Sequence, residues 1–296
     1  MYPENKNAKS VVLVDDDEDD RQFLREPLLR IVKGIKITEL TNGIDLLEFI
    51  KRQTPRNYPS LIVLDLDMPK MNGLEVLIFL KSVTAYRHIP VVMISANKNQ
   101  DFIGQVYQHG LSAFIAKPSS FEEYVRIAEL LDNSFLNQQC SYQNFALECQ
   151  IRNKSVLIIE DNPDHWMIMS KILRQTVSGI NIFRTFDRLS TLNFLLFNWK
   201  TLPEPPCLII LDLYLPSRDA GLHVLDTIRH FLFTHDKMPV PVVVFSYSDR
   251  ADDIAMSYRH FANVYITKPT DFTELSSCIA NIYNFWFRVV TLPKNI

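Results

Sequence analysis

The chain has little of what marks several large classes of protein. Its 296 residues carry a formal net charge of -3 and no block of Lys and Arg, so nothing indicates a nucleic-acid surface or a polybasic tail. The longest apolar stretches are strand-sized, far short of the ~20 residues that cross a bilayer. The first ten residues are polar and do not form a signal peptide. We therefore expect a cytoplasmic protein with neither a nucleic-acid nor a membrane partner.

Cysteine is scarce as well. The four cysteines, Cys140, Cys149, Cys207 and Cys278, include no C-x-x-C pair, so neither a zinc site nor a redox site has support in their spacing. We interpret them as ordinary thiols, with Cys207 at a strand start and Cys278 inside a helix. The length is that of about two domains. A hydrophobic content of 47% suffices for two cores.

One short run occurs twice. Residues 61–69 read Leu-Ile-Val-Leu-Asp-Leu-Asp-Met-Pro, and residues 208–216 read Leu-Ile-Ile-Leu-Asp-Leu-Tyr-Leu-Pro. Each apolar run stops on an aspartate, Asp65 or Asp212, which is typical of a strand buried on both faces. Such an aspartate lies at the edge of a parallel sheet, where ligands of open α/β folds bind. A lone strand-end Asp is more often a helix cap or turn residue. Two copies of a costly buried carboxylate favour chemistry instead.

Four features recur in the same order in both halves. They are an acidic pair after an apolar strand, the strand-end Asp, a hydroxyl after the next apolar run, and Lys-Pro after a short strand. In the first half these are Asp15-Asp16, Asp65, Ser95 and Lys117-Pro118, and in the second Glu160-Asp161, Asp212, Ser246 and Lys268-Pro269. The hydroxyl precedes the lysine by 22 residues in each half. This register indicates a duplicated domain.

Strands alternate with helices between these features, which predicts an α/β fold with helices on both faces of a parallel sheet. Strands are expected near 10–14, 35–40, 60–65, 90–95 and 112–116, and helices near 18–32, 43–52, 73–82, 99–109 and 119–132. The second half repeats this scheme and ends in an aromatic helix near 271–288. Pro27 is expected to kink the first helix or to displace its start. We predict domains at 1–133 and 154–296, joined by a linker at 134–153.

The four features have a common chemistry. The carboxyl ends of the first, third, fourth and fifth strands lie close together at one edge of such a sheet. Two carboxylates ~4 Å apart there repel each other by roughly 4 kcal/mol at an effective dielectric constant near 20. A divalent cation removes this conflict, and a site of carboxylates alone favours Mg²⁺ over zinc. Lys117 or Lys268 then serves as a point charge for a phosphoryl oxygen, and Ser95 or Ser246 as a hydrogen-bond donor. The strand-end Asp becomes a nucleophile on phosphorus.

Both halves, over nearly the whole chain, resemble receiver domains of two-component response regulators. The resemblance implies two flavodoxin-like (βα)5 doubly wound domains, each with a five-stranded parallel sheet in the order 2-1-3-4-5. It implies that Asp65 and Asp212 accept phosphate from a sensor histidine kinase or a histidine phosphotransfer protein. The ending at residues 285–293, Phe-Trp-Phe-Arg-Val-Val-Thr-Leu-Pro, also resembles stand-alone receivers that serve phytochrome-type kinases.

The resemblance assigns further roles by position. Mg²⁺ or Mn²⁺ would be held at Asp15, Asp16, Asp65, Asp67, Glu160, Asp161, Asp212 and Tyr214, with Asp67 and Tyr214 contributing backbone carbonyls. Ser95 and Ser246 would be switch hydroxyls, and Phe114 and Tyr265 switch aromatics. A downstream protein would bind the face made by helix four, strand five and helix five, and the chain could form a homodimer. The chain would be a self-phosphorylating and self-dephosphorylating receiver rather than a conventional enzyme.

The second half departs from the first around its acceptor. Its loop after Asp212 is one residue longer, Tyr214 stands where the first half has Asp67, and Tyr247 stands where it has Ala96. Two tyrosines beside one phosphorylation pocket would block attacking water. Our hypothesis is therefore that phosphorylation and hydrolysis are slower at Asp212 than at Asp65.

Two other functions compete with a phosphorylation-controlled protein that has two receivers and no output domain. One is a phosphorylation-independent scaffold with a partly degenerate second domain. The other is a haloacid-dehalogenase-type phosphatase, because Asp65-Leu66-Asp67 imitates its D-x-D sequence. That class needs the sequence on its first strand, and Tyr214 replaces the second Asp in the other half.

Several single residues have simple structural interpretations. Asp17, Asp19 and Asp20 are expected to be charges at a helix N-terminus rather than ligands. The aromatic residues at 285–287 are expected to be core. We expect surface positions for the following histidines: His88, His109, His165 and His223.

Overall fold

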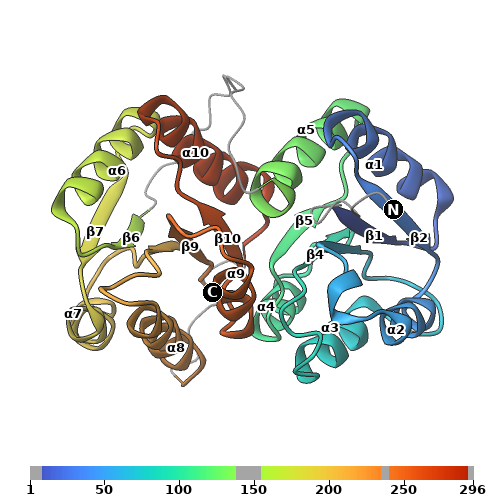
Figure 1. Ribbon diagram of the computed structural model, residues 1–296, viewed down its shortest axis with the longest axis horizontal. Helices are drawn as coiled ribbons and strands as arrows, with labels where there is room; N and C mark the ends of the chain where they lie inside the picture. Colours follow the sequence, from blue (N-terminus) through green and yellow to red (C-terminus); the bar gives the residue numbers. More distant parts are fainter. Residues whose placement is uncertain (1–8, 138–154, 235–239, 293–296) are drawn as a thin grey trace, which may run out of the picture. The chain divides into compact units, whose positions relative to one another are not determined.

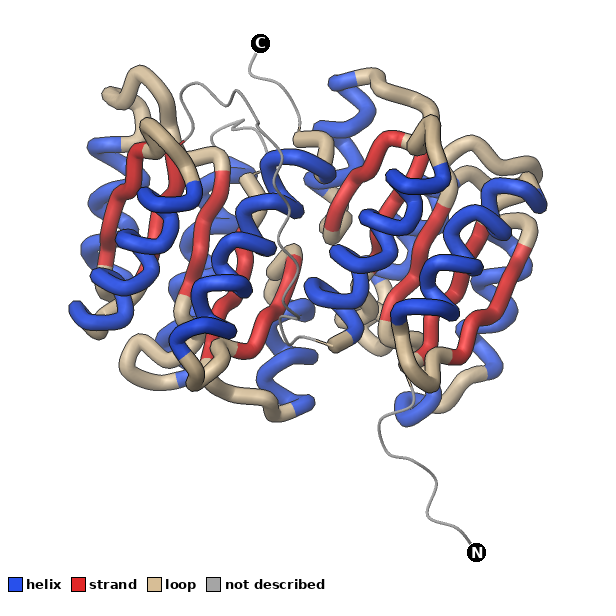
Figure 2. Tube along the Cα trace, turned by 90° about the horizontal axis from the view of Figure 1, so that it is seen from above, coloured by secondary structure: helices blue, strands red, loops and turns tan. Residues whose placement is uncertain are grey.

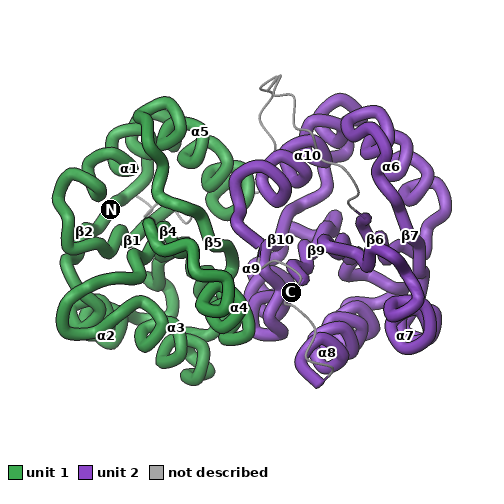
Figure 3. Tube along the Cα trace, turned by 180° about the vertical axis from the view of Figure 1, so that it is seen from behind, with its two compact units in different colours: residues 1–137 green, residues 138–296 purple. Residues whose placement is uncertain are grey.

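The computed structural model describes residues 9–137, 155–234 and 240–292. The chain divides into two compact units, Met1–Asn137 and Gln138–Ile296, here called unit 1 and unit 2 (Figure 3). Each unit contains one five-stranded parallel sheet (Figure 1). Of the predicted linker, residues 134–136 belong to a π-helical turn, and residues 138–153 lie outside the described part of the chain.

Unit 1 has the expected order of elements. Its strands are β1 (Ser10–Val14), β2 (Lys36–Leu40), β3 (Leu61–Leu64), β4 (Val91–Ser95) and β5 (Ala113–Ala116). Its α-helices are α1 (Glu18–Ile31), α2 (Gly43–Arg52), α3 (Gly73–Ser82), α4 (Gln100–Gln108) and α5 (Phe121–Leu131). The sheet order is β2-β1-β3-β4-β5. This confirms the predicted flavodoxin-like topology.

Unit 2 repeats the arrangement. Its strands are β6 (Ser155–Ile159), β7 (Asn181–Thr185), β8 (Leu208–Leu211), β9 (Val242–Ser246) and β10 (Val264–Thr267), in the order β7-β6-β8-β9-β10. Its α-helices are α6 (Pro163–Thr176), α7 (Arg188–Asn193), α8 (Arg218–Thr234), α9 (Ala251–Arg259) and α10 (Phe272–Asn284). In both units, helices lie on either side of the sheet (Figure 2).

The continuous apolar runs form the central strands. Every residue of β3 and β4 is buried, and the same holds for β8 and β9, because helices cover both faces of the sheet there. The edge strand β2 alternates partly exposed and exposed residues instead. The carboxyl ends of the buried strands are therefore rigid supports for any side chain that follows them.

Three helices of the described chain end in π-helical turns, at Asp132–Leu136, Phe194–Asn198 and Phe285–Val289. The last of these turns buries the aromatic residues at 285–287, which confirms that they belong to the core. Helix α1 begins at Glu18, nine residues before Pro27, so the expected displacement of its start does not occur. Cys278 is buried in α10 as predicted, but it is disulfide-bonded, so the interpretation of all cysteines as thiols is wrong. Among the described helices, none combines the length and apolar character that crossing a membrane requires.

Gly221 lies where α8 passes the end of β8. A Cβ at this position would be 1.8 Å from the carbonyl oxygen of Leu213, the residue after Asp212. We expect Gly221→Ala to lower the free energy of unfolding of unit 2 by about 1–3 kcal/mol, because backbone must move to admit the methyl group. Urea unfolding followed by tryptophan fluorescence measures this, since all three tryptophans (166, 199 and 286) lie in unit 2.

Gly104 in α4 is the matched control, because a Cβ there meets nothing within 4 Å. Gly104→Ala should raise the stability of unit 1 by up to about 1 kcal/mol through helix propensity, as measured by circular dichroism. An unchanged unfolding midpoint for Gly221→Ala would contradict the close approach of α8 to β8.

Candidate functional site

The strand ends of unit 1 bring the predicted residues together. Asp15 follows β1, Asp65 follows β3, and Lys117 follows β5. The Lys117 Nζ lies 2.9 Å from Asp15 Oδ2 and 3.4 Å from Asp65 Oδ1. Asp65 is only 5% exposed. Ser95, the last residue of β4, is fully buried, and its hydroxyl accepts the backbone N–H of Asn97 at 3.1 Å.

Local hydrogen bonds hold the loops that carry these groups. The Asp17 side chain caps α1 by accepting the N–H groups of Asp19 and Asp20, as its expected role requires. The Arg21 guanidinium donates to the backbone carbonyl of Asp15 at 2.6 Å. Both contacts fix the acidic pair against the start of α1.

The loop after β3 is held in the same way. Asn72 and Glu75 form a capping box at the start of α3. Gly73 donates its N–H to Leu66, and a Cβ on Gly73 would lie 2.5 Å from the carbonyl oxygen of Asp65. The Asp67 backbone N–H donates to Asp65 Oδ2 at 3.1 Å. Helix α3 therefore begins against the backbone of Asp65.

The ammonium group of Lys117 is the shared partner of Asp15, Asp20 and Asp65. Burial, followed by the negative charge of Asp15, raises the pKa of Asp65 to about 6. Burial also raises the pKa of Asp15. Burial opposes the charge on Lys117, but its bonds to Asp20 and Asp15 outweigh this and raise its pKa.

The donor set of unit 1 fits a hard divalent cation. Oxygen atoms of Asp15, Asp16 and Asp65 all lie within 4.8 Å of one another. Oxygen ligands are those that Mg²⁺ and Mn²⁺ take in proteins. A cation there would also offset the burial and the negative charge of Asp15, which together raise the pKa of Asp65.

Asp20 has a contact that sequence reasoning missed. It lies in the first turn of α1, as expected, but its Oδ2 is 2.6 Å from Lys117 Nζ, and its Oδ1 accepts the Tyr124 hydroxyl at 3.4 Å. A small cavity is lined by Asp15, Asp20, Asp65, Lys117 and Tyr124, among others. The available signal for this contact was the position of Asp20, five residues after Asp15. At this distance, the first turn of the helix brings the Asp20 side chain back over the strand ends.

Unit 2 has a more deeply buried version of this site. The Lys268 Nζ lies 2.7 Å from Glu160 Oε2 and 2.8 Å from Asp212 Oδ2. Lys268 is 4% exposed, Glu160 0% and Asp212 8%. Burial opposes the charge on Lys268, but Asp212 and Glu160 outweigh it and raise its pKa. Ser246, at the end of β9, is fully buried and accepts the N–H of Ser248 at 3.4 Å.

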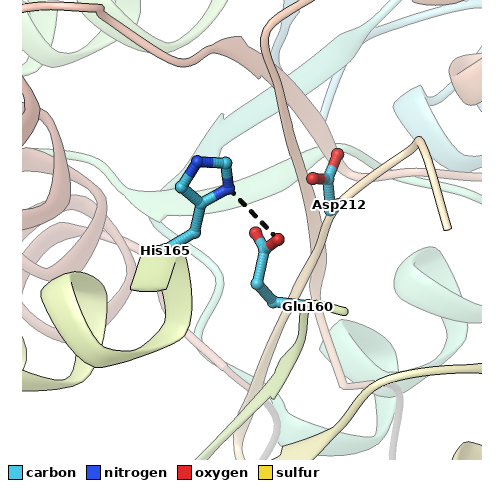
Figure 4. A group of neighbouring side chains, drawn as sticks. All are labelled: Glu160, His165 and Asp212. Atoms are coloured by element: carbon cyan, nitrogen blue, oxygen red, sulfur yellow. Dashed lines mark hydrogen bonds and ion pairs between the residues drawn. The ribbon is translucent and has the colours of Figure 1, made fainter. Parts of the chain in front are cut away.

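The metal-capable group of unit 2 differs from the predicted one. It consists of Glu160, His165 and Asp212, whose ligand atoms lie within 4.8 Å of one another, whereas Asp161 is exposed and is not part of it (Figure 4). His165 lies partly at the surface, as expected, but the sequence did not indicate its contact with the site. Its side chain is one-third exposed, and its Nδ1 lies 3.3 Å from Glu160 Oε1. The acidic turn is held by Arg184 of β7, which donates to the carbonyls of Glu160 and Asp161.

The two tyrosines of unit 2 take different positions. The Tyr247 ring lies 5.3 Å from the His165 ring and 5.2 Å from Lys268 Nζ, so it covers the site. The Tyr214 backbone N–H donates to Asp212 at 3.1 Å, but its hydroxyl donates to Asp253 at 2.8 Å. Of the two rings, that of Tyr247 therefore lies against residues of the site, whereas Tyr214 directs its hydroxyl to Asp253.

Asp253 forms a second contact group that the sequence did not reveal. This residue of α9 is fully buried and binds Tyr214, Arg218 and Ser248. Burial alone would raise the pKa of Asp253, but its hydrogen bonds from those three side chains lower it. The group ties the loop after the acceptor to α9. Unit 1 has Phe102 at the corresponding position, seven residues after the buried serine.

The predicted switch aromatics are both fully buried. The Phe114 backbone N–H donates to the Tyr107 hydroxyl at 3.0 Å. In the same way, the Tyr265 backbone N–H donates to the Tyr258 hydroxyl at 3.3 Å. The Tyr265 hydroxyl also donates to the Ser248 carbonyl at 2.7 Å. In unit 2 the aromatic residue is thus bonded directly to the loop that follows Ser246.

A doubly wound sheet in this order, with an acidic pair, an Asp, a hydroxyl and a lysine at its carboxyl edge, defines a receiver-type domain. The family described as the response regulator receiver domain matches residues 11–129 and 156–280. The chain belongs to this family and contains two copies of the domain. The phosphatase alternative has no support, because Asp65 follows the third strand of its unit rather than the first.

Two relatives agree with this assignment, and a solved structure is similar to part of the chain. Response regulator Rcp1 of Synechocystis sp. (strain ATCC 27184 / PCC 6803 / Kazusa) is 32% identical over 141 residues, which are 47% of this chain and 93% of Rcp1. The polar-differentiation response regulator DivK of Brucella ovis is 30% identical over 118 residues, 40% of this chain and 91% of DivK. The solved Mn²⁺-bound form of Rcp1 is 25% identical with a TM-score of 0.39, covering 42% of this chain and 92% of that one.

Proposed function

We propose that this chain is a response regulator in which Asp65 and Asp212 accept phosphoryl groups from a histidine kinase or a histidine phosphotransfer protein. One observation carries the proposal. In both units the lysine after the fifth strand contacts the aspartate after the third strand, at 3.4 Å for Lys117 and 2.8 Å for Lys268. Family membership supports the same chemistry in each unit.

The proposed reaction is an in-line displacement at phosphorus. A carboxylate oxygen of Asp65 or Asp212 attacks the phosphorus of a phosphohistidine, the P–N bond breaks, and the imidazole nitrogen keeps the electron pair and takes up a proton. Lys117 or Lys268 contacts one phosphoryl oxygen as a positive charge, and the buried serine hydroxyl donates to another. A Mg²⁺ or Mn²⁺ ion bound beside the acceptor would neutralise charge on the phosphoryl oxygens.

The proposed output is a change in a protein-binding face. The phosphoryl group adds about -1.5 to -2 charge at the strand ends. The hydroxyls of Ser95 and Ser246 would turn towards it and draw in the loops before α4 and α9. The faces formed by α4, β5 and α5 and by their counterparts in unit 2 would then bind a downstream protein or a second copy of the chain in the cytoplasm.

Intact mass spectrometry of the full chain tests the proposed function. Incubation with Mg²⁺ and a small phosphodonor should add two phosphoryl groups, and removal of the metal with a chelator should prevent both additions. A chain that gains no phosphoryl group from the small donor or from a cognate kinase would leave the second candidate, a phosphorylation-independent scaffold. The cover that Tyr247 forms over Lys268 favours that candidate for unit 2 alone.

Tyr247→Ala is expected to speed the loss of phosphate from Asp212 by roughly tenfold, or about 1.4 kcal/mol of barrier. The reason is that the ring covers the lysine and histidine beside the acceptor, where it would exclude attacking water. The measurement is the decay of the phosphorylated mass in an Asp65→Ala background, so that only Asp212 contributes.

The reciprocal variant, Ala96→Tyr in an Asp212→Ala background, should slow the loss of phosphate from Asp65. Wild-type unit 2 should also gain and lose phosphate more slowly than unit 1. Equal rates at the two acceptors would refute the role of the tyrosine.

A further inference from the structure

The metal-capable group of unit 2 contains an imidazole that unit 1 lacks. His165 lies in the first turn of α6, where Asn162 caps the helix and accepts the backbone N–H of His165. Its ring faces the end of β6, with Nδ1 3.3 Å from Glu160 Oε1, and Asp212 stands on the neighbouring strand end (Figure 4). Two ligands bound to one ion at ~2.1 Å are at most ~4.2 Å apart, so ligand atoms already within 4.8 Å need only small movements.

The same position in unit 1 has a different partner. Asp20 and His165 each lie five residues after the first acidic residue of their unit. Asp20 binds Lys117 at 2.6 Å, and the metal-capable group beside it is formed by three carboxylates. In unit 2 the lysine contacts Glu160 and Asp212, the counterparts of Asp15 and Asp65, and the imidazole at the position of Asp20 faces Glu160.

The His165 ring is held in place from its other side. The Tyr247 ring lies 5.3 Å from it at an angle of 55°, and the same ring lies over Lys268. This contact supports the orientation in which Nδ1 faces the carboxylates. A ligand whose orientation is supported in this way loses less conformational freedom when it binds an ion.

The donor atoms decide which ions such a group selects. Oxygen ligands suit Mg²⁺, Ca²⁺ and Mn²⁺, whereas imidazole suits the later first-row ions such as Co²⁺, Ni²⁺ and Zn²⁺. We propose that unit 2 is a mixed nitrogen–oxygen site in which His165 Nδ1, Glu160 and Asp212 bind a late first-row divalent ion in preference to Mg²⁺, while unit 1 keeps an all-oxygen site. On binding, the ion takes the place of the Nδ1···Oε1 contact between His165 and Glu160, and the neutral imidazole carries its one proton on Nε2.

This inference rests on the proposed function only in using the same strand-end carboxylates. Tryptophan fluorescence of the full chain makes the test specific for unit 2, because all three tryptophans lie there and Trp166 is the residue after His165. Co²⁺ is the probe, because an ion with unpaired d electrons quenches indole emission at short range. Titrations with Co²⁺ in the absence of Mg²⁺, and with Mg²⁺ as competitor, give the two affinities.

We expect His165→Gln to weaken Co²⁺ binding by at least the roughly 10- to 100-fold that loss of a supporting group costs at metal sites, and to change Mg²⁺ binding less than about twofold. His165→Asp, which restores the residue type of unit 1, should shift the preference back towards Mg²⁺. His260→Gln is the control, because His260 and Asp226 form another His–carboxylate pair in unit 2, 2.6 Å apart, and this variant should leave the quenching unchanged.

Equal Co²⁺ affinity in the wild type and in His165→Gln would overturn the inference, as would loss of the quenching in His260→Gln. Absence of any response to Co²⁺ would also overturn it. The proposed function survives each of these results if Mg²⁺ still supports phosphorylation at Asp212, so the two failures are distinguishable.

Discussion

Replacing Asp65 by Asn is expected to abolish phosphorylation of unit 1 and to leave that of unit 2 intact. Asn keeps the size of the side chain, so the contact of Gly73 with the backbone of residue 65 persists. The amide has no carboxylate oxygen to attack phosphorus, which makes the expected loss complete rather than partial. Intact mass after incubation with a small phosphodonor and Mg²⁺ should show one phosphoryl group in place of two.

Asp67→Asn is the matched control for this prediction. Asp67 is exposed, and its contact with Asp65 uses its backbone N–H rather than its carboxylate. The control should therefore keep both phosphoryl groups. Two groups on Asp65→Asn, or one on Asp67→Asn, would show that the acceptor of unit 1 has been misidentified.

The same Asp65→Asn substitution should stabilise metal-free unit 1 in a pH-dependent way. The pKa of Asp65 is about 6 in the folded chain against 3.8 ordinarily, so the folded state binds more protons and stability falls as pH rises from about 4 to 6. When Asp65 is fully ionised, this pKa shift lowers the free energy of unfolding of unit 1 by about 2–3 kcal/mol. The variant should lack this decline, giving a gain above pH 6 and almost none below pH 4, measured by urea unfolding with a chelator present.

Lys268→Met is expected to lower the stability of unit 2 by about 3–5 kcal/mol at neutral pH. It removes the cation bonded to Glu160 and Asp212, both of which are buried at the strand ends. Two buried carboxylates without a counter-charge repel each other, and each loses the hydrogen bond that the ammonium group donates. Urea unfolding followed by tryptophan fluorescence reports on unit 2 alone, and phosphorylation of Asp212 should also be lost.

Lys117→Met provides the comparison in unit 1. Its ammonium group and its partners Asp15 and Asp20 are partly exposed to solvent, so the expected loss of stability is only about 1 kcal/mol or less. An equal loss of stability in the two variants would contradict the proposed difference in burial.

Much of the fold follows from patterns that are local in sequence. Continuous apolar runs gave the central strands because both faces of the sheet are covered, and the edge strand β2 was found from its place between helices. The recurrence of the same residue types in the same order in both halves predicted the following strand-end residues: Asp65, Asp212, Lys117 and Lys268. They lie together because parallel strands place their carboxyl ends at one edge of the sheet. The π-helical turns after α5 and α10 were not foreseen, because backbone hydrogen-bond registers leave no mark in composition.

The misses at the site have one physical cause. Asp20 was placed correctly at the N-terminus of a helix and His165 was expected at the surface, but which strand end each side chain reaches depends on its rotamer and on the position of the lysine. Asp253 was missed for a similar reason, because its partners, Tyr214 in the loop after β8 and Arg218 at the start of α8, lie 35 to 39 residues away in sequence. Such contacts between loops carry no periodicity that a single sequence would show.

The most direct test of two working receivers is the number of phosphoryl groups on three forms of the full chain after incubation with Mg²⁺ and a small phosphodonor. The account predicts two groups on the wild type, one on Asp65→Ala, and one on Asp212→Ala. Two groups on either variant would contradict it, because phosphate would then reside on a residue other than the strand-end aspartates. A single group on the wild type, lost only with Asp65→Ala, would contradict the account for unit 2.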